Sequence, residues 1–135
     1  MDEFESLFDP QTNVLVHRAC APVTVDAVIR CATTWVERLR GQPFHALWDL
    51  RGQKFDIDID ELVFGINDHI VWLHQHRRDQ RHAYLVDSRI GVFLAHALKR
   101  RIHLDWDVFS DEQLARDWVR TGDPAFRVTA DAMAL

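Results

Sequence analysis

The sequence predicts an α/β fold, a mixed and mostly parallel sheet of about five strands covered by about four helices. Three observations predict it. Extended and helical apolar patterns alternate along the chain after an initial hairpin. Helix-capping residues precede several of the helical patterns. No repeat, low-complexity stretch or Pro/Gly/Ser-rich linker divides the chain. Strands that alternate with helices need crossover connections, so most strand pairs should be parallel.

The first elements are a predicted antiparallel hairpin and a helix. Glu3–Phe8 and Val14–Ala19 are extended runs, and Asp9–Asn13 between them is rich in turn residues. Thr24 is a suitable N-cap for the helix, which Gly41 ends. Its apolar residues recur at helical spacing: Val25, Val28, Ile29, Ala32, Trp35, Val36 and Leu39.

A strand and a second helix follow. Phe44–Leu50 has the apolar character of a buried strand. Asp58 and Glu61 have the spacing of a capping box, so the second helix should begin near Ile59 and run to about Arg78. Its predicted core residues are Leu62, Val63, Ile66, Ile70 and Leu73.

Two further strand and helix units complete the predicted fold. The strand Ala83–Val86 leads into a helix capped by Asp87 or Ser88. The strand Ile102–Phe109 leads into a helix whose cap lies within Ser110–Gln113. The last helix carries the apolar residues Leu114, Ala115, Trp118 and Val119.

The bulk composition narrows the function classes. The chain has 135 residues, of which 47% are hydrophobic, and a formal net charge of -5 at pH 7. One core suffices at this length, so we assign residues 1–122 to a single domain and residues 123–135 to a C-terminal tail. No run has the length and apolar character of a membrane span or signal peptide, which favours the cytoplasm by default. The negative charge argues against binding to nucleic acid.

Neither cofactors nor metals are predicted. Cys20 and Cys31 lack metal-site spacing and are interpreted as reduced thiols. Four histidines surround the end of the second predicted helix, but their spacing does not place them on one face: His69, His74, His76 and His82. The basic residues near the ends of the second and third helices could merge into one basic patch, but compensation of helix dipoles is the favoured interpretation: Arg77, Arg78, Arg81, Lys99, Arg100 and Arg101.

The carboxyl edge of the sheet is where an open α/β fold usually binds ligands. No glycine-rich phosphate loop follows a predicted strand, and a Gly-x-Ser-x-Gly motif is absent, so no enzymatic activity is predicted. The polar residues expected near this edge are Asp49, Arg51, Asp56, Asp87, Ser88, Arg89 and Ser110.

The order of elements, together with the segment His45–Gly52, resembles the STAS superfamily and especially its SpoIIAA-like branch. Phe8–Val16 is similar to the opening hairpin of that branch, and Trp106–Trp118 is similar to its closing strand and helix. The resemblance covers nearly the whole chain. It implies a small bacterial regulatory or ligand-binding domain without enzymatic activity.

The sequence departs from STAS proteins that antagonise anti-sigma factors, which carry a phosphorylatable Ser or Thr at the start of the second helix. The equivalent stretch here, Gln53–Glu61, contains no hydroxyl, which rules out a phosphoswitch at that site. Asp56 and Asp58 occupy the switch-equivalent loop. Asp58 could act as a permanent mimic of a phosphate, but helix capping is the favoured interpretation.

The second helix carries apolar residues that its core face does not explain. Phe64 and Val71 lie on one line away from the core residues, and Trp72 shares another flank with His69 and His76. Such a surface indicates a protein partner, a homodimer or a lipophilic ligand. Coverage by the chain's own tail is a further alternative, through Phe126, Val128 and Met133.

The sequence therefore favours a non-enzymatic regulatory or protein-interaction domain that acts through the second helix. The alternative is a carrier or sensor of a lipophilic small molecule in an apolar pocket under that helix.

Overall fold

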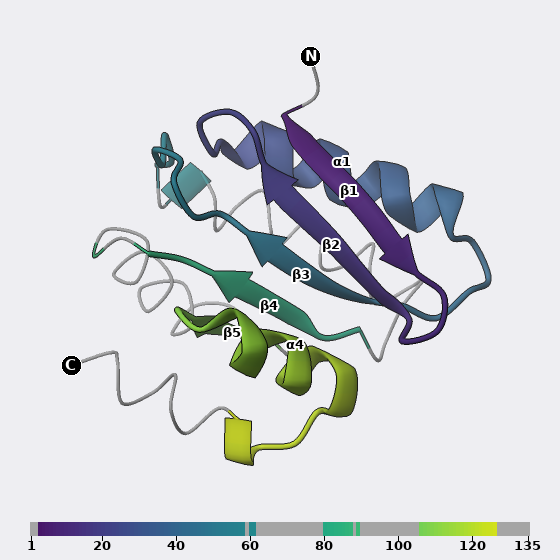
Figure 1. Ribbon diagram of the computed structural model, residues 1–135. Helices are drawn as coiled ribbons and strands as arrows, with labels where there is room; N and C mark the ends of the chain where they lie inside the picture. The colour runs from purple at the N-terminus through teal and green to yellow at the C-terminus, as the bar shows by residue number, and fades with distance from the viewer. Residues whose placement is uncertain (1–2, 59, 62–79, 88, 90–105, 127–135) are drawn as a thin grey trace.

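A computed structural model of the chain describes residues 3–58, 60–61, 80–87, 89 and 106–126. Its strands and helices follow one another in an order that agrees with the sequence prediction (Figure 1). The elements are β1 (Phe4–Asp9), β2 (Val14–Ala19), α1 (Val25–Arg38), β3 (His45–Asp49), β4 (His82–Leu85), β5 (Trp106–Phe109) and α4 (Glu112–Thr121).

The five strands form one mixed sheet in the order β1-β2-β3-β4-β5. β1 and β2 are antiparallel, and each later pair is parallel. The predicted combination of an antiparallel first hairpin with a mostly parallel sheet is therefore confirmed. Because β2 to β5 are mutually parallel, their carboxyl ends lie at the same edge of the sheet.

The two described helices cover opposite faces of the sheet (Figure 1). Thr24 caps α1 by accepting a hydrogen bond from the Ala27 N–H at 3.2 Å, as predicted. On the face beneath α1, Trp48 is buried with Val25 and Ala27. On the other face, Trp118 of α4 is buried against Leu47, Ala83 and Phe109.

Strands β2 and β3 pack in clusters with helix residues on both faces, whereas β1 does so on one face only. Four of the five residues in β3 are buried, so its sequence lacks polar and apolar alternation. β1 alternates between inward and exposed residues, because the cluster beneath α4 reaches Val14 and Val16 of β2 but includes no residue of β1. On this face the β1 strand is consequently open.

The last helix begins one residue later than a cap at Ser110 would place it. Asp111 is the N-cap, and its carboxylate accepts a hydrogen bond from the Leu114 N–H at 3.0 Å. The cap therefore lies within the predicted segment Ser110–Gln113, at Asp111 and not at Ser110. Gly122, with φ of 71°, ends the helix in the left-handed conformation that glycine adopts without strain.

Two helices, α1 and α4, are present among the described residues, so the predicted number of about four is not reached there. The described residues Asp60 and Glu61 are helical, as the predicted start of the second helix requires. The rest of that predicted helix and most of the third lie outside the described residues. In the described part of the chain, no helix combines the length and apolar character needed to cross a bilayer.

Candidate functional site

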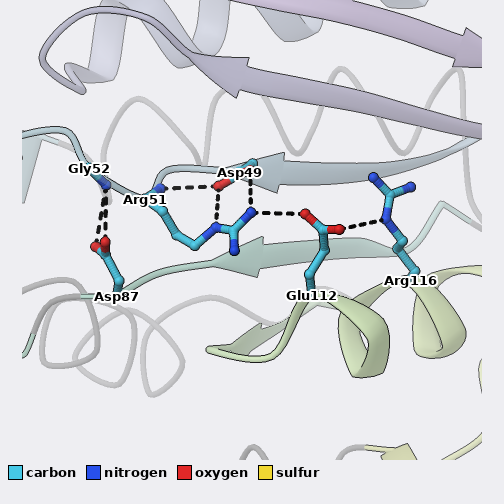
Figure 2. Close-up of polar contacts among 6 residues, drawn as sticks. All are labelled: Asp49, Arg51, Gly52, Asp87, Glu112 and Arg116. Atoms are coloured by element: carbon cyan, nitrogen blue, oxygen red, sulfur yellow. Dashed lines mark hydrogen bonds and ion pairs between the residues drawn. The ribbon is translucent and has the colours of Figure 1, made fainter.

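Charged side chains from two distant segments meet at the carboxyl edge of the sheet (Figure 2). Asp49 ends β3, and Arg51 follows it two residues later. The Arg51 guanidinium donates from Nε and Nη2 to the two carboxylate oxygens of Asp49, each at 2.9 Å. Nη2 also donates to Oε1 of Glu112, the first residue of α4, at 2.8 Å. Arg51 therefore ties the end of β3 to the last helix.

The two acids differ in their exposure to solvent. The Asp49 side chain is 12% exposed, and that of Glu112 is 44% exposed. The hydrogen bonds from Arg51 lower the pKa of Asp49, and the same contacts raise the pKa of Arg51. Glu112 also pairs with Arg116 at 3.4 Å. Each charge in this network faces an opposite charge, which leaves Asp49 ionised and unsuited to proton transfer near neutral pH.

An open groove of about 650 Å³ lies beside the network, on the uncovered side of the hairpin. Its lining includes the apolar Val14 and Val16 and the basic Arg18 and Arg116. Leu7 also lines it and is 76% exposed. The cluster beneath α4 reaches β2 but includes no residue of β1, which leaves this face of β1 open to the groove.

The loop after β3 is held by backbone hydrogen bonds. The Gly52 N–H donates to the Asp87 carboxylate at 3.2 Å. The Val23 N–H donates to the Lys54 carbonyl at 2.7 Å, and the Asp56 N–H donates to the Val23 carbonyl at 2.8 Å. Asp87 thus stabilises the loop after β3. The sequence predicted a helix cap at Asp87 or Ser88 and did not predict this contact.

Along this loop, residues that pack against the core alternate with exposed acids. Phe55 and Ile57 pack against the core beneath α1. Asp56 and Asp58 are exposed. Asp58 Oδ1 accepts hydrogen bonds from the Asp60 N–H at 2.9 Å and the Glu61 N–H at 3.1 Å, so the predicted capping role is confirmed.

A second polar cluster lies beneath α1, on the opposite face of the sheet. The buried His17 Nδ1 is 2.7 Å from Ser6 Oγ and 3.3 Å from Cys31 Sγ. Ser6 and Cys31 also line a groove of about 520 Å³ between β1 and α1. The sequence alone indicates no partner for Cys31, whereas in the fold His17 is its partner.

The protonation states of this cluster argue against nucleophilic catalysis. Burial, with a smaller contribution from His82, lowers the pKa of His17 to about 3. Burial raises the pKa of Cys31. An imidazole this weakly basic is a poor general base, and a neutral thiol is a poor nucleophile. Ser6, His17 and Cys31 are therefore a neutral hydrogen-bonded cluster of the core.

The predicted site residues are only partly placed by the structure. Asp49, Arg51 and Asp87 meet at the carboxyl edge, as expected, while Asp56 is on the neighbouring loop. The predicted partner-binding residues lie outside the described residues: Phe64, His69, Val71, Trp72 and His76.

Sequence reasoning missed Glu112 and Arg116. The available signal was their position in the first turns of a helix that follows a parallel strand. Among the described residues, no group of three or more His, Cys, Asp or Glu side chains could hold a metal ion.

Comparison with known proteins identifies a similar architecture. No family model and no curated protein matches the chain. A similar solved structure is that of an uncharacterized protein from Shewanella loihica PV-4, of the DUF3478 family and with a SpoIIAA-like fold. The two share 13% sequence identity with a TM-score of 0.57, over 86% of this chain and 91% of that chain. The chain thus has a SpoIIAA-like fold.

Proposed function

We propose that the protein is a non-enzymatic regulatory domain that binds a protein partner through the loop 53–61 and the second helix. One observation carries this proposal. The loop is fixed by backbone hydrogen bonds at Val23 and by the packing of Phe55 and Ile57, while Asp56 and Asp58 remain exposed. The acids are thereby presented to solvent on an ordered backbone.

An anchored loop suits binding for an energetic reason. A surface that is already ordered loses less conformational entropy when a partner binds. Asp56, Asp58, Asp60 and Glu61 are all exposed, so the surface complements a basic partner. Because residues 53–61 contain no hydroxyl, their negative charge is permanent and cannot be set by phosphorylation.

The second helix would supply the apolar part of the contact. It follows the acidic loop directly, and its predicted surface includes Phe64, Val71 and Trp72, with His69 and His76 on the flank of Trp72. Interfaces commonly combine a central apolar cluster with a polar rim. Among the described residues no observation favours the lipophilic carrier, which stays a prediction, because most of the second helix that would cover its pocket lies outside them.

The test compares partner capture by the full-length wild type and charge variants. Asp56→Lys reverses a loop charge, and Phe64→Asp places a charge in the predicted apolar contact. Glu37→Lys is the matched control, since Glu37 is an exposed acid on α1, away from the loop. Quantitative mass spectrometry should show a partner that wild type and the control retain and both site variants lose.

The interaction should then be measured with the purified partner by calorimetry. We expect each site variant to weaken binding by roughly tenfold or more, the size expected for a charge reversal or a lost apolar anchor. Equal binding by all four proteins would contradict the proposal. A lipid-sized mass that co-purifies in native mass spectrometry would instead favour the lipophilic carrier.

A further inference from the structure

A groove lies between α1 and β1, which run alongside each other (Figure 1). Its volume of about 520 Å³ is within the range of small-molecule binding sites. From β1 its lining includes Phe4 and Ser6. From α1 it includes residues that helical spacing places on one side of the helix, namely Arg30, Cys31, Thr34, Trp35 and Arg38. The groove therefore combines aromatic, neutral polar and charged side chains.

One of the charges that line this groove is not balanced by an opposite charge. Arg30 is paired with Glu3, and Glu5 is paired with Arg18. Arg38 forms no ion pair in the part of the chain that the structure describes. A ligand with a single negative charge would balance Arg38, so charge complementarity favours an anion as the occupant.

Trp35 positions Arg38 for such a ligand. The Arg38 guanidinium lies over the Trp35 ring, 5.0 Å from the ring centroid. This cation–π contact is electrostatic and uses none of the N–H donors of the guanidinium. Those donors form a planar fork that matches the two oxygens of a carboxylate. Because the contact already restrains Arg38, less conformational entropy is lost when an anion binds.

The polar groups that β1 and the middle of α1 contribute to the groove are neutral. Ser6 Oγ and Cys31 Sγ lie 2.7 Å and 3.3 Å from His17 Nδ1. Burial raises the pKa of the Cys31 thiol, while the hydrogen bond with Ser6 and the positive charge of Arg38 oppose part of that rise. The charge of Arg38 therefore acts inside the groove, whereas Ser6 and Cys31 suit the uncharged part of a ligand.

We propose that this groove binds a small aromatic carboxylate, with its carboxylate on Arg38 and its ring beside Trp35. Aromatic side chains pair favourably with other rings, which favours a flat body for the ligand. A phosphate carries up to two negative charges near neutral pH, more than Arg38 alone balances, and Glu3 and Glu5 line the same groove. A carboxylate carries one charge, so it matches Arg38 better.

The test is a heteronuclear NMR titration of the full chain with benzoate at constant ionic strength. We expect saturable binding with a dissociation constant on the order of 1 mM, since the ligand is small and the groove is open. Benzamide has the same ring without the charge, and inorganic phosphate has charge without the ring. Each should bind at least about tenfold more weakly than benzoate.

Variants of Arg38 test the contact with the carboxylate. Arg38→Gln should raise the dissociation constant of benzoate about tenfold or more, because it removes the charge-assisted hydrogen bonds. Arg38→Lys keeps the charge but loses the planar fork, so its value should be intermediate. Arg40→Gln is the matched control, since Arg40 is also exposed but does not line the groove. Thermal unfolding of each variant checks that the fold is intact.

Three results would overturn the proposal. One is the lack of a saturable shift with benzoate at concentrations up to about 20 mM, far above the expected dissociation constant. Another is equal binding of benzoate by wild type and Arg38→Gln. The third is binding of benzamide or phosphate as tight as that of benzoate. The proposal does not rest on the partner-binding function, because that function is tested at Asp56 and Phe64 instead.

Discussion

The polar cluster beneath α1 and the polar cluster at the carboxyl edge of the sheet differ in their charge states. Under α1, burial keeps His17 and Cys31 neutral beside Ser6. At the carboxyl edge, Asp49 and Arg51 stay charged because they pair with each other. The difference shows that the packing around a polar group decides its charge state, and that residue type alone does not.

The largest expected effect is that protonation of His17 destabilises the fold in acid. Its folded pKa, about 3, is below the ordinary histidine value of 6.5, so between these pH values the unfolded chain binds a proton that the folded chain does not. Its contribution is fully present above pH 6.5 and is lost as the pH falls toward 3, at a slope of about 1.4 kcal/mol per pH unit. Urea unfolding as a function of pH measures this slope.

His17→Gln is the matched control for that titration. Glutamine can still accept a hydrogen bond from Ser6 but does not titrate. The variant should lose the His17 part of the slope between pH 6.5 and 4, whatever its stability at neutral pH. An identical slope in both proteins would show that His17 is not buried in its neutral form.

A smaller loss is expected when the charged cluster loses one acid. Asp49→Asn keeps the size of the side chain but leaves Arg51 with Glu112 as its described acidic partner. We expect a loss of about 1–2 kcal/mol at pH 7, because hydrogen bonds to charged groups contribute that much and Asp49 is largely shielded from water. Chemical unfolding at neutral pH measures the loss.

The pH dependence separates Asp49 from His17. The pKa of Asp49 is lowered, so its contribution is present above the pKa of an unfolded aspartate and disappears as the pH falls through the folded value. The difference between wild type and Asp49→Asn should therefore persist at pH 5, where His17 has already begun to cost stability. A difference that vanished at pH 5 would contradict this assignment.

The smallest effect is expected at the exposed end of the ionic network. Arg116 and Glu112 are each 44% exposed and are one helical turn apart. Arg116→Ala should cost at most about 0.5 kcal/mol, and added salt should remove the difference. Thermal unfolding at low and high salt checks both points. A larger loss that persists in salt would mean that Arg116 stabilises the fold by packing.

The carboxyl edge was predictable as a location but only partly as a set of contacts. Asp49, Arg51 and Asp87 follow parallel strands, so the sequence alone placed them at this edge. It did not pair Arg51 with Glu112, which is 61 residues away. It also left Cys31 without His17, 14 residues away, because that contact depends on how α1 lies over β2.

The sequence by itself determined the order of strands and helices, the caps at Thr24 and Asp58, and the lack of a hydroxyl in residues 53–61. These features depend on neighbouring residues, whose spacing and hydrogen bonding are local. Tertiary structure decided which face of the hairpin stays open, which charges pair and which polar groups are neutral. Those outcomes depend on strand order and on the coverage of each face, so they arise only when distant segments pack together.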